Sequence, residues 1–143
     1  YCKTPDKQEA GVVAIFHELL GAGLLGDGIY KPMKSGYGTQ YDLYAKYIRN
    51  GVSQNLVIEF KSGLEAIIKD LDDQNKHLSE MDLLVAWDAN IGRFDDANMT
   101  LEPVDEEDNQ HFFGVNYELI THQYEEPIPV ILLKKYIDDL PPH

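Results

Sequence analysis

Residues 39–60 constrain the fold of this chain more than any other segment. Residues 39–48 alternate in character and are rich in tyrosine, and residues 52–60 form a run with β-branched and apolar side chains. Both compositions are typical of β-strands. Between them stands Arg49-Asn50-Gly51, and Asn-Gly fits the positive φ angles of a tight hairpin turn. The segment therefore predicts two neighbouring antiparallel strands.

The flanking segments predict helices and one buried strand. A first helix is expected from residue 5 or 6 to residue 20, and a second over residues 63–78, because apolar residues recur there at helical spacing. Residues 81–87 form an apolar run with one charge near its start, which is typical of a strand covered on both faces. That strand is expected at the centre of a sheet.

The remaining segments are less regular. Residues 29–33 predict a loop or short strand, 88–114 an irregular polar region, 115–121 a strand, and 128–136 a strand or short helix. At 143 residues the chain is long enough to bury one sizeable core. We therefore expect a single α/β domain over residues 1–143, with a mixed central β-sheet flanked by helices.

Composition narrows the class of protein. The chain is 43% hydrophobic and 26% charged, which argues against a disordered or collagen-like chain. Its apolar runs are far shorter than the roughly 20 residues of a membrane-spanning helix. The single cysteine, Cys2, cannot form an internal disulfide, so an intracellular location, nuclear or cytoplasmic, is expected. Because the chain starts without methionine and ends in Pro-Pro-His, we expect a segment of a longer protein.

The net charge of −13 is unevenly distributed. Residues 1–61 hold seven Lys/Arg and six Asp/Glu, whereas residues 62–143 hold five and nineteen. A phosphate-binding protein usually needs a basic surface, so the acidity argues against nucleic acid as a partner. Because the first half is nearly neutral, the objection applies mainly to the second half.

Four charged residues are predicted to meet near the end of the second hairpin strand. Because strand side chains alternate, Glu59 and Lys61 face one side of the strand, and Leu56, Ile58 and Phe60 face the other. Asp42, on the preceding strand, can be brought against them. Glu9 falls within the apolar stripe of the first helix, where a buried carboxylate needs a partner or a metal, whereas Glu18 falls on the opposite side.

This order of elements resembles the PD-(D/E)xK nuclease superfamily, which has a restriction-endonuclease-like core. A helix with an inward Glu, a hairpin with Asp, Glu-x-Lys, a further helix and an apolar strand cover about residues 5–90. More narrowly, Tyr41-Asp42, Ile58-Glu59-Phe60-Lys61 and the run 81–87 are similar to nuclease-type domains found beside GHKL ATPase modules. The chain departs from the family name in having Tyr41 where the proline would stand.

The resemblance implies metal-dependent hydrolysis of phosphodiesters. Asp42, Glu59 and the carbonyl of Phe60 would bind Mg²⁺ or Mn²⁺, which prefer oxygen ligands. Lys61 would position the attacking water or stabilise developing charge, and Glu9 would complete the metal's surroundings. Fold-level analogy favours DNA over RNA as substrate. The expected partners are nucleic acid and other domains of a parent protein, with no membrane, and a homodimer is left open.

Lysines and arginine of the first half are the expected phosphate contacts: Lys31, Lys34, Lys46 and Arg49. In the second helix, Gln74 and Lys76 lie where some relatives place a further polar active-site residue, although a solvated helix end is the simpler interpretation. Asp82 would act near the metal or, more simply, hold the start of its strand. The scattered histidines do not have the spacing of a zinc site.

Alternatives remain for each group. In the simpler interpretation, Glu59 and Lys61 form an ordinary surface ion pair on a solvated edge of the sheet. Glu9 then interacts favourably with the helix dipole at the start of its helix. The chain as a whole would then be a catalytically inactive nuclease-like domain for protein interaction or assembly within a larger ATPase protein. A module that binds a basic protein is a third hypothesis, which rests on acidity alone.

Overall fold

A computed structural model describes residues 9–35, 43–73, 78–122 and 124–141, apart from the side chains of Lys34, Ser35 and Leu78. Its first half comprises α1 (Glu9–Gly21), β1 (Tyr30–Ser35), β2 (Leu43–Arg49), β3 (Val52–Gly63), α2 (Ala66–Asp72) and the 3-10 turn η1 (Leu78–Glu80). Its second half comprises β4 (Leu83–Asp88), α3 (Ile91–Asp96), β5 (Met99–Pro103), η2 (Glu106–Asp108), β6 (Tyr117–Thr121), β7 (Tyr124–Leu132) and α4 (Leu133–Asp138).

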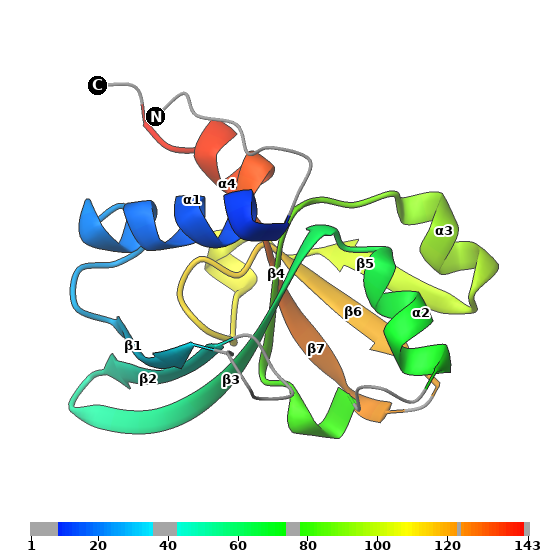
Figure 1. The fold of residues 1–143 in the computed structure, drawn as a ribbon, viewed down its shortest axis with the longest axis horizontal. Helices are drawn as coiled ribbons and strands as arrows, with labels where there is room; N and C mark the ends of the chain where they lie inside the picture. Colours follow the sequence, from blue (N-terminus) through cyan, green and yellow to red (C-terminus); the bar gives the residue numbers. More distant parts are fainter. Residues whose placement is uncertain (1–8, 36–42, 74–77, 123, 142–143) are drawn as a thin grey trace.

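The strands of the described residues form one seven-stranded sheet in the order β1-β2-β3-β4-β7-β6-β5 (Figure 1). β4 runs parallel to both β3 and β7, and the other neighbouring strands are antiparallel. The sheet is therefore mixed and flanked by helices, which confirms the predicted α/β class. β4 stands in the middle of the order, and four of its residues are buried, as its apolar sequence predicted.

Two hydrophobic cores lie on opposite faces of the sheet. Leu56, Ile58 and Phe60 of β3 belong to the core beneath α1 and α4, whereas Val57 packs into the core beneath α2 and α3. The Phe16 ring of α1 meets the Phe60 ring edge-on, with centroids 5.2 Å apart. Strand alternation thus assigns successive side chains to different cores, as predicted for β3.

The hairpin between β2 and β3 turns at Asn50 and Gly51, whose φ angles are 55° and 77°. Arg49 pairs with Val52 directly across this two-residue loop. Positive φ at both positions is the geometry that Asn-Gly favours, because it matches the right-handed twist of the two strands. The hairpin and its position are confirmed.

Other boundaries differ from the sequence predictions. The region 88–114 is not merely irregular, because it contains α3, β5 and η2, and the segment predicted as a strand or short helix holds the end of β7 and then α4. α2 is shorter than predicted: β3 runs on to Gly63, and residues 74–77 lie outside the described ranges. Among the described helices, none combines the length and apolar character that a membrane crossing requires.

Candidate functional site

Glu59 is buried at the carboxyl-terminal part of β3. Its exposed fraction is 0%, both of its carboxylate oxygens are buried, and it is the one charged side chain that counts as buried among the described residues. Its neighbour Phe60 fills the core beneath α1, so Glu59 faces the side covered by α2. Burying a carboxylate is costly, and such groups mark candidate functional sites.

Lys61 lies two residues along β3 on the same face, as predicted, and it forms an ion pair with α2. Its Nζ is 2.5 Å from the Oδ2 of Asp70, and the exposed side-chain fractions are 16% for Lys61 and 23% for Asp70. α2 buries Ile67 and Leu71 against the sheet, which brings the intervening Asp70 over the end of β3. Asp70 therefore faces the Lys61 ammonium, and less than a quarter of its side chain is exposed.

The electrostatic surroundings keep Lys61 charged. Desolvation by burial lowers the pKa of Lys61, but the hydrogen bond and the Coulomb attraction of Asp70, followed by the charges of Glu59 and Glu9, raise the pKa above its ordinary value. The side chain is consequently an ammonium at neutral pH. It can donate hydrogen bonds and stabilise negative charge, but it is not suited to act as a general base.

Glu9 lies at the first residue of α1, and its side chain is exposed. The predicted burial of Glu9 is wrong, because burial of the apolar stripe begins only at Val12, nearly one turn later. Glu9 nevertheless raises the pKa of Lys61, so its carboxylate acts on the ammonium through space. Its role at a metal stays a prediction, and Glu18 is exposed as expected.

Asp42, Gln74 and Lys76 lie outside the described residues. Within the described ranges, no three Asp, Glu, His or Cys side chains are grouped so that they could hold a metal ion. The predicted donors that the structure does describe, the carboxylate of Glu59 and the backbone carbonyl of Phe60, are hard oxygen atoms of the kind that Mg²⁺ and Mn²⁺ prefer, and the role of Asp42 as a further ligand stays a prediction.

Asp82 has a structural role. Its Oδ2 accepts a hydrogen bond of 2.8 Å from the backbone N–H of Val57, and its own N–H donates to the carbonyl of Val57 at 2.9 Å. These two hydrogen bonds join the start of β4 to β3 at Val57, two residues before Glu59. The structural interpretation of Asp82 accounts for both contacts.

The predicted phosphate contacts divide between the two faces. Lys31 and Lys46 are directly opposite each other on β1 and β2, so they share one face, whereas Arg49 lies over the ring of Phe113, 5.5 Å from its centroid. Lys46 in turn pairs with Asn55 of β3, which alternation places on the face of Glu59. The four residues therefore do not form one patch; for Lys34 only the backbone is described, opposite Tyr44.

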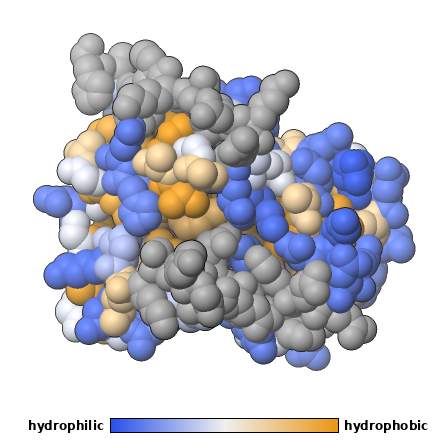
Figure 2. Space-filling view, viewed as in Figure 1, coloured by the Kyte–Doolittle hydropathy of each residue, from blue (hydrophilic) through white to orange (hydrophobic). Residues whose placement is uncertain are grey.

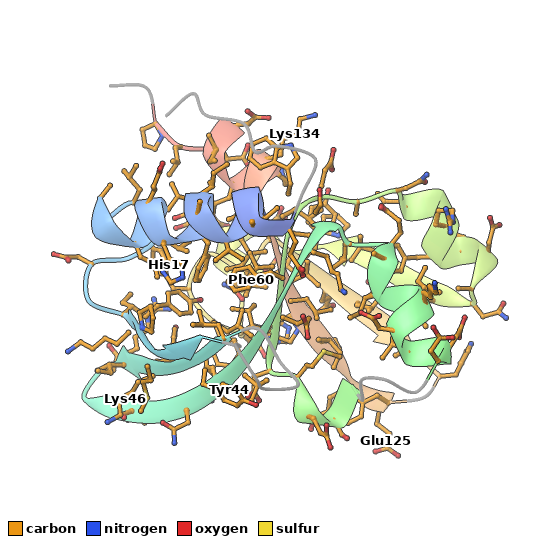
Figure 3. All side chains as sticks on the ribbon, viewed as in Figure 1. His17, Tyr44, Lys46, Phe60, Glu125 and Lys134 are labelled. Carbon is orange, nitrogen blue, oxygen red and sulfur yellow. The ribbon has the colours of Figure 1, made fainter. Side chains whose placement is uncertain are left out.

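The acidic run of η2 lies on the other face of the sheet from this basic pair. β5 is at the opposite edge of the sheet from β1, but η2, which follows it, reaches the end of β2, where Asp105 and Glu106 lie near Arg49. Figure 3 shows Lys46 and Glu125 at different ends of the molecule in this view. Figure 2 shows hydrophilic residues around the periphery and an apolar area near the middle, beside α1. The acidic residues of η2 therefore lie beside Arg49 and not on the face of Lys31 and Lys46.

Comparison with known proteins adds no assignment: no family model, curated protein or solved structure matches this chain.

Proposed function

We propose that this chain is a metal-dependent phosphodiesterase of the PD-(D/E)xK type that hydrolyses nucleic acid, with DNA as the preferred substrate. The observation that carries the proposal is the buried carboxylate of Glu59 beside the half-buried ammonium of Lys61 on one strand. The succession of α1, the β2–β3 hairpin, α2 and β4 supports the proposal, because the resemblance implies a helix, a hairpin, a further helix and an apolar strand in that order.

The strand register supports a role for Asp42. Leu43 pairs with Ile58, and in an antiparallel pair the residue before Leu43 and the residue after Ile58 leave the pair in the same direction. Those residues are Asp42 and Glu59. We infer that these two carboxylates share a metal.

Each residue of the proposed site has a distinct task. Asp42, Glu59 and the Phe60 carbonyl would hold Mg²⁺ or Mn²⁺, which would polarise the scissile phosphate and make a bound water more acidic. The Lys61 ammonium donates to the attacking water or to a phosphate oxygen. Asp70 is a positioning residue, because its carboxylate holds the ammonium at the end of β3. Glu9 adds negative charge at the start of α1.

Lys31 and Lys46 offer a path for the phosphate backbone. Like charges directly opposite each other destabilise a strand pair, so a partner that neutralises both is favoured. Asn55, the β3 partner of Lys46, precedes Glu59 by roughly 14 Å along an extended strand. A nucleic-acid strand lying along this face of the hairpin would contact both lysines and then reach Glu59.

Cleavage assays test the proposal. Labelled single- and double-stranded DNA and RNA are incubated with the protein and either Mn²⁺, Mg²⁺ or EDTA, while calorimetry measures Mn²⁺ binding. We expect metal-dependent cleavage of DNA that is lost in Lys61→Ala, and Mn²⁺ binding that is lost in Asp42→Asn and in Glu59→Gln. Lys69→Ala, which changes an exposed lysine of α2, is the matched control and should cleave like the original protein.

A second candidate function is a catalytically inactive nuclease-like domain that binds another protein or another part of a larger ATPase protein. Its support is the Lys61–Asp70 ion pair, which occupies the ammonium that catalysis would need. A protein that neither binds Mn²⁺ nor cleaves any of the four substrates would overturn the nuclease proposal and leave this second one. A protein that binds Mn²⁺ but cleaves none of the four substrates would contradict the proposed catalytic role of Lys61 or the proposed substrate class.

A further inference from the structure

A cavity of about 450 Å³ lies on the face of the sheet that carries α1 and α4, opposite the face of Glu59. It is enclosed by the end of β2, by the segment between β5 and β6, and by α4 with the residues that follow it. The volume falls within the range of small-molecule sites in proteins.

Hydrogen bonds across the fold hold the walls in place. The hydroxyl of Tyr136 donates to the carbonyl of Leu24 at 2.6 Å, which fixes α4 to the turn that follows α1. The backbone N–H of Phe113 donates to the Tyr47 hydroxyl at 2.9 Å, and the Phe113 carbonyl accepts from Tyr30. Because these walls are anchored before any ligand arrives, binding would require little reorganisation.

The cavity contains charges of both signs, and they differ in whether they are already paired. Lys135 and Asp139 form an ion pair of 3.0 Å with each other. Within the described residues, Arg49, Asp105 and Glu106 form no ion pair, although each lines the cavity. Arg49 lies over the Phe113 ring, and the remaining walls include the apolar Val104 and Val115.

These groups together select for a particular chemistry. A guanidinium binds carboxylate with matched, bidentate geometry, which gives Arg49 an anionic group as its partner. Asp105 and Glu106 offer two exposed carboxylates to a cation. The pKa of Lys135 is raised mainly by its hydrogen bond and Coulomb attraction to Asp139, with a smaller contribution from Asp105, and the pKa of Tyr136 is raised first by burial and then by the charge of Glu106. The apolar walls between them fit an uncharged stem. A ligand with one charge alone would leave part of this set without a partner.

We propose that this cavity binds a molecule that carries a carboxylate and a primary ammonium at the two ends of an aliphatic stem. The carboxylate meets Arg49, the ammonium meets Asp105 and Glu106, and the stem lies against Phe113 and Tyr136. Two sources present this chemistry: a free ω-amino acid, and a C-terminal lysine of a polypeptide, whose side-chain ammonium and terminal carboxylate are joined by such a stem. The site is separate from Glu59 and does not depend on nuclease activity.

Binding of ω-amino acids tests the proposal on the unmodified protein. Calorimetry or NMR titration is performed with a series from glycine to 8-aminooctanoate, and with hexylamine and hexanoate as analogues that each keep one charge. We expect one length in the series to bind best, and each one-charge analogue to bind roughly tenfold to a hundredfold more weakly. Absence of binding across the series at millimolar concentration, or equal binding by the one-charge analogues, would overturn the proposal.

Substitutions and peptides locate the site and identify the source. Arg49→Met and the double variant Asp105→Asn, Glu106→Gln should each lose binding by a similar factor, while Lys134→Met and Glu102→Gln, exposed residues that do not line the cavity, should not. Binding that survives both cavity variants would refute this location. A peptide ending in lysine that binds more tightly than 6-aminohexanoate, and loses binding when its terminus is amidated, would assign a polypeptide as the ligand; the reverse order would assign the free amino acid.

Discussion

The Nζ of Lys61 and the Oδ2 of Asp70 lie 2.5 Å apart and join the end of β3 to α2. Asp70 follows Lys61 by nine positions in the sequence, and the turn between strand and helix lies between them, so the contact depends on how α2 packs against the sheet. The ion pair does three things: it orients the ammonium, it ties α2 to the sheet, and it keeps a positive charge beside the buried Glu59. Each of these effects can be measured.

Asp70→Asn should destabilise the protein. The substitution removes one charge of a largely buried pair and leaves Lys61 with a weaker partner, which is expected to lower the free energy of unfolding by about 1–3 kcal/mol. Urea unfolding at pH 7 measures this loss. Asp72→Asn changes an exposed carboxylate of the same helix and is the control. Equal unfolding free energies for the two variants would contradict a structural role for the pair.

The contribution of the Lys61–Asp70 pair should disappear at alkaline pH. The pKa of Lys61 is raised in the folded protein above its ordinary value of 10.5, so the folded state holds the proton more tightly than the unfolded state. The resulting stability is fully present below the unfolded pKa and is lost as pH rises through the folded pKa. The difference in unfolding free energy between the original protein and Asp70→Asn should therefore be constant from pH 8 to about 9.5 and shrink above about pH 10.5. A difference that grows with pH would contradict this sign.

Glu59→Gln should lower the pKa of Lys61. The charge of Glu59 is one of the influences that raise this pKa, and glutamine keeps the shape of the side chain while removing the charge. NMR titration of the Lys61 side chain in lysine-labelled protein measures the shift. Glu102→Gln, on the edge strand β5, is the control and should leave the titration of Lys61 unchanged. An unchanged pKa in Glu59→Gln would show that the carboxylate does not act on the ammonium.

Local sequence patterns were sufficient to predict the centre of this fold. The Asn50-Gly51 turn was predicted because the dihedral angles it needs are a property of two residues. The alternation that assigns Glu59 and Phe60 to opposite faces follows from strand geometry alone. The central position of β4 follows from the burial of both its faces. Each prediction depended on a regularity within a few residues.

Elements stabilised by distant contacts were missed. α3 is six residues long and buries only Phe94, so no helical repeat is visible in its sequence. β5 contributes Met99 and Leu101 to the core, and it owes its position to pairing with β6, whose sequence lies beyond an acidic loop. The ion pair of Asp70 was missed for the same reason, because helical periodicity does not reveal a cation on another element. The predicted burial of Glu9 was also wrong. The apolar stripe of an ideal helix gives the direction of a side chain, but it does not show that the helix extends beyond the sheet at its first turn.

The side chain of Asn116 should contribute strongly to stability, because it joins the start of β6 to the end of β7. It is 8% exposed, its amide nitrogen donates to the carbonyl of Leu132 at 3.0 Å, and its side-chain oxygen accepts from the N–H of Leu132 at 2.9 Å. Asn116→Ala leaves both backbone groups without partners in a buried place, and is expected to cost about 2–4 kcal/mol of unfolding free energy in urea. Asn116→Asp should also destabilise the protein, because a carboxylate cannot donate to the carbonyl.

Asn90→Ala is the control for this prediction. Asn90 is an exposed asparagine at the start of α3 whose side chain makes no capping hydrogen bond, so its replacement should change the unfolding free energy by less than about 0.5 kcal/mol. If Asn116→Ala is no more destabilising than Asn90→Ala, the bridge between Asn116 and Leu132 does not hold α4 and β7 in place.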